Sequence, residues 1–133
     1  AYSLYNSGKL LRDHLHNFPE LESRAVDPEP DPFEKPVIFI HRHFPERVAV
    51  SRPIRAILSP RVTGLPNTSI QPISPVEALR ALAPSTMIHL SPDASVLAGM
   101  GALVRRIPAF RLNLGTRTGD IAPAILDLLR SLD

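Results

Sequence analysis

The first part of the chain carries apolar side chains at the spacing of a helix. Three of them follow one another at intervals of four and three residues, which places them on one helical face. This spacing predicts a helix over residues 7–18, with Asn6 or Ser7 as the N-cap because a short side-chain oxygen can accept the free N–H groups of the first turn. The apolar face consists of Leu11, Leu15 and Phe18.

Three further helices are predicted in the second half, each from an apolar stripe behind a capping residue. Ser74 precedes Pro75, and Glu77 follows three positions later, which is the pattern of a capping box. We expect this helix to stop before Pro84, since proline removes an N–H donor. The other two helices are predicted to begin at Ser91-Pro92-Asp93, running to about Arg106, and behind Asp120 as N-cap.

Extended segments lie between the predicted helices. The apolar run 37–40 indicates a buried strand, and residues 110–114 alternate between apolar and polar types, as strands do. Residues 47–50 and 54–58 form a second extended region, interrupted by Pro53 and closed by Pro60. A turn is predicted over residues 63–67.

Residues 24–36 read as a surface loop, because four prolines and four acidic residues leave few donors for a ladder. Together these elements predict an α/β fold: a single domain over residues 1–133 with a mixed sheet and flanking helices.

Composition narrows the classes of partner. The apolar runs are too short to span a bilayer, so we expect no membrane partner. The net charge is only +2 and aromatic residues make up 5% of the chain, which provides neither a cationic stripe nor a stacking platform and argues against nucleic acid. Cysteine is absent, which excludes disulfides and thiolate chemistry and suits a cytoplasmic location.

Gly8 and Lys9 stand where a phosphate-binding loop would end. That loop has the form G-x-x-x-x-G-K-[ST], in which the first glycine permits a tight turn and the hydroxyl binds magnesium. Here Ser3 occupies the first glycine position and Leu10 follows the lysine. We therefore interpret Gly8-Lys9 as part of a capped helix start. The chain contains neither a nucleophile elbow nor another complete catalytic set, so its sequence does not decide whether it is an enzyme.

Two other groups of residues suggest binding chemistry. His41 and His43 follow a predicted strand, where alternate residues share a face and can chelate a metal if a third ligand such as His89 or Glu46 joins them. Arg55 and Arg61, together with Arg52, bracket another strand beside a turn.

That arginine cluster is suited to holding a phosphate or another oxyanion. In the alternative interpretation these arginines are exposed residues paired with the acidic segment 27–34.

Several segments resemble bacterial proteins of the HPr serine kinase family. Residues 3–10 (SLYNSGKL) are similar to a segment that follows the nucleotide-binding loop in that family. Residues 53–64 (PIRAILSPRVTG) resemble its strand and turn, and residues 73–86 (ISPVEALRALAPST) its capped helix. Residues 104–112 and 119–126 are similar to its last strand and helix.

The resemblance implies the phosphoenolpyruvate-carboxykinase-like P-loop fold and an ATP-dependent serine kinase. ATP and Mg²⁺ are then implied for the full-length protein. No cofactor is implied for this chain alone, because the family's Walker loop and acidic magnesium-binding segment would lie before Ala1. We expect a C-terminal part that is not catalytically competent by itself. Its position in the family offers Ser7, Lys9, Arg55 and Arg61 as residues near a phosphate.

A C-terminal part would expose apolar surface and a sheet edge. We therefore expect self-association or association with the missing N-terminal half. The alternative from another class is a stand-alone, non-catalytic module that recognises a protein partner or a small anionic ligand. A third possibility is a small metal-dependent enzyme that uses His41 and His43.

Overall fold

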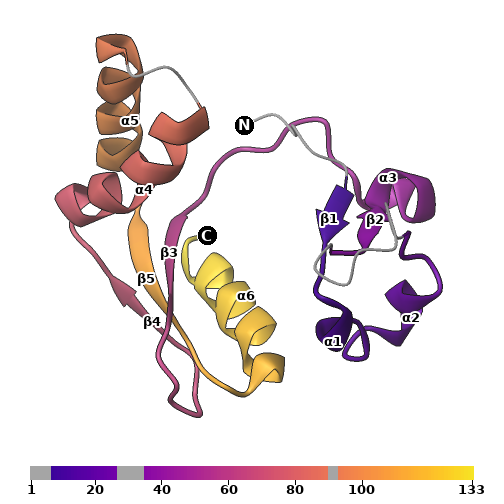
Figure 1. Cartoon of the computed structure of the whole chain (residues 1–133). Coiled ribbons are helices and arrows are strands. Elements are labelled where there is room, and N and C mark those ends of the chain that lie inside the picture. Colours follow the sequence, from indigo (N-terminus) through magenta and orange to yellow (C-terminus); the bar gives the residue numbers. More distant parts are fainter. Residues whose placement is uncertain (1–6, 27–34, 90–92) are drawn as a thin grey trace. The chain divides into compact units, whose positions relative to one another are not determined.

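The computed structural model describes residues 7–26, 35–89 and 93–133 (Figure 1). The sequence predicted one domain over residues 1–133, whereas the chain divides into two compact units, Ala1–Pro53 and Ile54–Asp133. Each unit is described by itself.

The first unit is built around a two-stranded antiparallel ladder. Gly8 lies opposite Ile38, which is 1% exposed and is among the most deeply buried residues of this unit together with Leu15 and Pro36. The elements in chain order are β1 (Ser7–Lys9), α1 (Arg12–Leu15), α2 (Pro19–Glu22), β2 (Val37–Phe39), α3 (Ile40–His43) and the 3-10 helix η1 (Pro45–Arg47).

The prediction of one helix over residues 7–18 is wrong. Ser7 begins a strand and does not cap a helix, and the N-cap position of α1 is Leu11, without a side-chain capping bond. Two effects explain the difference: glycine is a poor helix former, and pairing with the apolar strand β2 stabilises an extended backbone. Of the predicted apolar face only Leu15 is buried. Asn6, the other predicted cap, lies outside the described residues.

The strand expected over 37–40 is confirmed as β2, except that Ile40 already begins α3. Most of the predicted loop 24–36 lies outside the described residues, and Val26 at its start exchanges two backbone hydrogen bonds of 2.8 Å with Val37. The extended region predicted for 47–50 is wrong at its start. Its first residue, Arg47, is the last residue of η1. That helical turn begins at Pro45, whose fixed φ suits the first position of a helix.

The second unit contains a three-stranded mixed sheet in the order β3-β5-β4. β5 is parallel to β3 and antiparallel to β4, with Ile57 opposite Ala109 and Ser69 opposite Asn113. The elements are β3 (Ile57–Val62), β4 (Ser69–Pro72), α4 (Pro75–His89), α5 (Ala94–Arg106), β5 (Ala109–Leu114), the 3-10 helix η2 (Thr118–Asp120) and α6 (Ile121–Ser131).

Both outer strands of this sheet contain a proline. β3 continues through Pro60, where the sequence predicted its end. The N–H groups of Ile57 and Thr63 point toward β5 and donate to the carbonyls of Pro108, just before that strand, and of Leu114, at 2.9 and 3.2 Å. Alternate residues of a strand face the same neighbour, so the nitrogen of Pro60 faces away from β5 and costs no ladder bond.

The same reasoning applies to β4. The N–H of Ile73 donates to the carbonyl of Ala109 at 2.9 Å, which turns the nitrogen of Pro72 away from β5. Each free edge of the sheet therefore lacks one donor that an added strand would need.

The turn over 63–67 is confirmed, and Gly64 there has a φ of 72°. β4 is not predicted from the sequence, because it contains a single large aliphatic side chain, Ile70, and follows the turn directly. The predicted end of α4 is also wrong, since the helix continues through Pro84 to His89. A proline inside a helix removes only one backbone bond, so the helix can continue when other contacts hold it.

The predicted starts of the last two helices are largely confirmed. The carboxylate of Asp93 accepts the N–H of Ser95 at 3.0 Å, as a helix cap does, while Ser91 and Pro92 lie outside the described residues. Asp120 occupies the N-cap position of α6 but makes no side-chain capping bond, because η2 leads into the helix instead.

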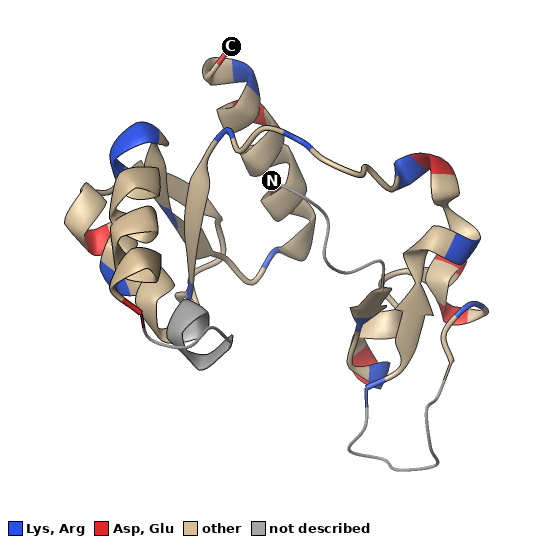
Figure 2. Cartoon of the chain, turned by 90° about the horizontal axis from the view of Figure 1, so that it is seen from above, with Lys and Arg blue, Asp and Glu red and all other residues tan. Residues whose placement is uncertain are grey.

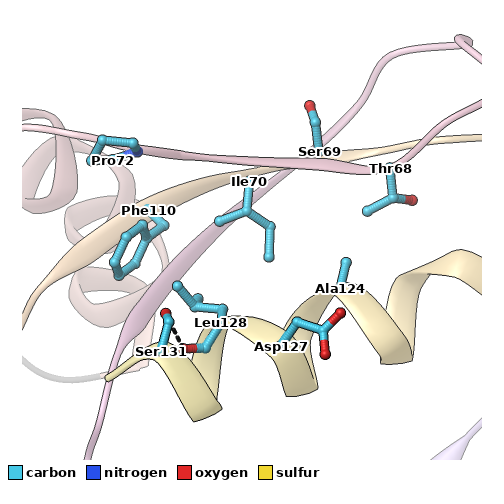
Figure 3. Close-up of a pocket in the computed structure, with 9 residues that line it drawn as sticks. All are labelled: Thr68, Ser69, Ile70, Pro72, Phe110, Ala124, Asp127, Leu128 and Ser131. Carbon is cyan, nitrogen blue, oxygen red and sulfur yellow. Dashed lines mark hydrogen bonds between the residues drawn. The ribbon is translucent and has the colours of Figure 1, made fainter. Parts of the chain in front are cut away.

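The core of the second unit lies between the sheet and α4 and α5. Ile57 and Ala109, the first residues of β3 and β5, pack with Ala78 of α4 and Val104 of α5. α6 covers the opposite face of the sheet, where Phe110 and Ile70 lie near Leu128 (Figure 3). The predicted class, an α/β fold with a mixed sheet and flanking helices, is confirmed. In the described parts of the chain no helix combines the length and the apolarity needed to cross a membrane.

Candidate functional site

Ser7 and Lys9 lie in β1 of the first unit, and both are exposed. Their backbone belongs to an antiparallel ladder and not to a loop wrapped around a phosphate. The helix that follows, α1, has only four residues. The geometry that makes a Gly-Lys pair bind phosphate, a row of N–H groups leading into a long helix, is therefore not present at Gly8 and Lys9.

Arg55 and Arg61 lie in the second unit. Arg55 precedes β3, and its guanidinium donates to the carboxylate of Asp133 at 2.8 Å. Arg61 is an exposed residue of β3 itself. The structure thus gives Arg55 a carboxylate partner and places Arg61 at an exposed position of β3.

His41 and His43 both lie in the single turn of α3 and not on a strand. Residues two positions apart on a helix differ by about 200° in direction, so the predicted two-histidine chelate is wrong in geometry. The ring of His41 packs edge-on against Phe39, with centroids 6.0 Å apart. The searched part of the chain contains no group of three histidine or carboxylate side chains suited to a metal ion.

Charged residues are distributed over both units (Figure 2). In the first unit, guanidinium groups stack on aromatic rings: Arg24 and Arg47 lie 4.6 and 5.0 Å from the centroid of Phe44, and Arg42 lies 4.5 Å from that of Phe39. These three arginines therefore pack against neighbouring aromatic rings of the same unit.

A polar pocket lies in the second unit between α4 and the parallel pair β3–β5. Ser59 and Arg111 are register partners, so their side chains lie side by side on the sheet face that also carries Ile57 and Ala109. The cavity has a volume of about 510 Å³. Its lining consists of Ile57, Leu58, Ser59, Pro60, Ala81, Leu82 and Arg111.

The polar groups of this pocket connect to the cap of α4. Glu77 places one carboxylate oxygen 3.6 Å from the guanidinium of Arg111. Its other oxygen accepts the backbone N–H and the hydroxyl of Ser74, at 3.1 and 2.9 Å. These hydrogen bonds from Ser74 lower the pKa of Glu77, and the charges of Arg111 and Arg80 lower it further.

A second cavity, of about 330 Å³, lies on the other face of the sheet beneath α6 (Figure 3). Its floor is apolar, formed by Ile70, Phe110 and Leu128. The polar groups near it are engaged locally: Asp127 pairs with Arg130 at 2.9 Å, and the Ser131 hydroxyl donates to the backbone within α6. This cavity offers little chemistry beyond apolar contact.

Ser59 and Arg111 are not among the site residues predicted from the sequence, although the sequence contains one signal for Arg111. Along β5, Ala109, Arg111 and Asn113 fall on one face, and large apolar residues occupy the alternate positions. An arginine on the face that also carries core residues indicates a polar site within a packed layer. The partner Ser59 could not be inferred, because the register of β3 against β5 depends on tertiary pairing.

Comparison with known proteins adds no assignment: no family model, no curated protein and no solved structure matches this chain.

Proposed function

We propose that this chain is the C-terminal portion of an HPr-serine-kinase-like protein, a member of an ATP-dependent phosphotransferase family. The supporting observation is the order of elements in the second unit. The segments that resemble the family fall on β3 and its turn, on α4, on β5 and on α6, in the same order as the family's strand, helix, strand and helix.

The capped helix is the most specific part of this support. Residues 73–86 resemble the family's capped helix, and Ser74 and Glu77 exchange the hydrogen bonds of a capping box at the start of α4. The pocket at Ser59 and Arg111 adds an arginine that lines a cavity beside the parallel pair β3–β5.

The chain alone is not proposed to catalyse the reaction. Phosphoryl transfer needs magnesium, a phosphate cradle and a residue that positions the nucleophile. The sequence contains no Walker loop, and the described residues offer no set of magnesium ligands. In this proposal ATP and Mg²⁺ therefore belong to the complete protein. We place that protein in the cytoplasm. The chain over residues 1–133 then associates with the N-terminal half or with a second copy of itself.

A second candidate is a stand-alone, non-catalytic module that recognises a protein partner or a small anion. The observation that favours it is the pair of prolines on the sheet edges. Pro60 and Pro72 each remove an outward donor, so the three-stranded sheet is poorly suited to being extended by strands of a larger domain.

The reading frame upstream of the Ala1 codon separates the two candidates. The kinase proposal expects the motif G-x-x-x-x-G-K-[ST] there, and the protein expressed from the full frame should gain thermal stability with Mg-ATP, since a ligand that binds the native state stabilises it. The chain over residues 1–133 should show no such shift. A frame that starts at Ala1, or an ATP shift in the isolated chain, would contradict the kinase proposal.

A further inference from the structure

We propose that the pocket between α4 and the β3–β5 pair binds an organic anion, with its phosphate or carboxylate head held by Arg111 and Ser59. This site lies wholly within the second unit. It therefore stands or falls separately from the kinase proposal.

Ser59 is the first reason. It is a polar residue with 8% of its surface exposed, and no hydrogen bond satisfies its hydroxyl from another described residue. The hydroxyl is not among the fully buried, unpartnered polar atoms of the described chain, so it is accessible from the cavity that the residue lines. Because Ser59 lines the cavity, a ligand in the pocket can accept its hydrogen bond.

Arg111 is the second reason. Its side chain is 31% exposed, and its charge partner within the described chain, Glu77, lies 3.6 Å away, beyond the usual length of a charged hydrogen bond. A guanidinium has five N–H donors in a planar fork that matches the two oxygens of a carboxylate or phosphate. Within the described chain Glu77 is the charged group that faces this fork, and Arg111 also lines the cavity.

Glu77 fixes the arginine without saturating it. Both hydrogen bonds from Ser74 go to one oxygen of Glu77, so only the other oxygen faces Arg111. The carboxylate thus shares the guanidinium of Arg111 with a ligand anion in the cavity. It also competes with that anion by charge.

The remaining walls indicate what accompanies the anionic head. Ile57, Ala81 and Leu82 are apolar, and a volume of about 510 Å³ exceeds what a phosphate ion alone would fill. The ligand is therefore an organic anion whose body rests on these side chains. An inorganic ion should bind more weakly, because it leaves the apolar part of the pocket wet.

The experiment titrates the chain over residues 1–133 with phenyl phosphate, benzoate and inorganic phosphate. Isothermal titration calorimetry measures the affinity, and thermal melting measures the stabilisation by each anion. We expect saturable binding of at least one aromatic anion, tighter than that of inorganic phosphate. The stronger of the two identifies the head group. If neither aromatic anion binds saturably, or if inorganic phosphate binds equally well, the proposal is overturned.

Three variants give a signature that non-specific binding would not reproduce. Arg111→Gln should weaken the affinity roughly tenfold, the usual effect of removing a charged hydrogen bond. Ser59→Ala should also weaken binding while leaving the free protein as stable as the parent, because the hydroxyl that it removes makes no hydrogen bond within the described chain. Glu77→Gln should tighten binding, since glutamine can still serve in a capping box but carries no competing charge.

Arg105→Gln is the matched control, because it removes the same charge from an exposed position at the end of α5. It should leave affinity unchanged. Equal losses in the Arg105 and Arg111 variants would reduce the effect to general charge attraction and overturn the site. If Arg111→Gln fails to fold, a loss of affinity in Ser59→Ala at unchanged stability still supports the site, and an unchanged affinity overturns it.

Discussion

Ser74 and Glu77 exchange hydrogen bonds across the first turn of α4. The N–H and hydroxyl of Ser74 donate to one carboxylate oxygen of Glu77, and the N–H of Glu77 donates to the Ser74 hydroxyl at 3.2 Å. The two residues thereby satisfy donors that the start of a helix leaves free. Because Glu77 also faces Arg111, the cap links the helix start to the pocket.

Ser74→Ala should lower the free energy of unfolding by about 1 kcal/mol, the usual cost of losing an N-cap. For a unit of this size that corresponds to a fall in Tm of roughly 4–8 °C. Urea unfolding monitored by circular dichroism measures the change in free energy, and a thermal melt measures the change in Tm. Ser74→Thr should recover most of the loss, and if both variants unfold like the parent chain, the cap contributes nothing.

Stability should fall in acid partly because of Glu77 and Asp93. Hydrogen bonds from Ser74 lower the pKa of Glu77 in the folded state below its ordinary value of 4.5, and bonds from Ser95 lower the pKa of Asp93 below 3.8. A lowered folded-state pKa means that the unfolded chain binds the proton more readily. This contribution is complete above the unfolded-state pKa and disappears as the pH falls through the folded-state pKa.

Urea midpoints measured from pH 6 to pH 2.5 test this dependence. Glu77→Gln should flatten the acid limb, and Asp93→Asn should flatten its lower part, because neither amide titrates. A parent chain whose midpoint rises on acidification through this range would contradict both assignments.

Gly115→Ala should destabilise the second unit by about 1–3 kcal/mol, the range typical of overpacking. A Cβ atom at Gly115 would lie 2.5 Å from the backbone of Pro66 and Asn67, and backbone atoms cannot move aside cheaply. Gly119→Ala is the control, since nothing lies within 4 Å of the added atom there. Equal urea midpoints for the two variants would show that the loop after β5 does not pack as described.

Pro60→Thr should increase self-association. The substitution restores an outward N–H on an edge strand, and a complete row of donors is a template for a further strand. Sedimentation velocity over a concentration series measures the effect. Pro123→Ala, in the first turn of α6, should leave the distribution unchanged. A Pro60→Thr variant that associates no more than this control would show that the proline does not protect the edge.

Local signals account for what the sequence predicted. The starts of α4 and α5 depend on residues two or three positions apart, Ser74 with Glu77 and Asp93 with Ser95, so the chain itself carries the information. The alternating strand β5 was predicted for the same reason.

The missed strands depend on distant partners. β1 and β4 have three and four residues, too few for a pattern, and each is extended because it pairs with a strand far along the chain. Gly8 lies opposite Ile38, and Ser69 opposite Asn113. The pocket was missed likewise, because only the parallel register brings Ser59 beside Arg111.

The position of β5 determines when the sheet can form. β5 is the central strand, yet it is the last of the three along the chain, and β3 and β4 both pair with it. During synthesis neither outer strand has its partner until residues 109–114 have left the ribosome. The helices α4 and α5, whose caps are local, can form before the sheet. This unit should therefore gain its cooperative stability only after β5 has emerged.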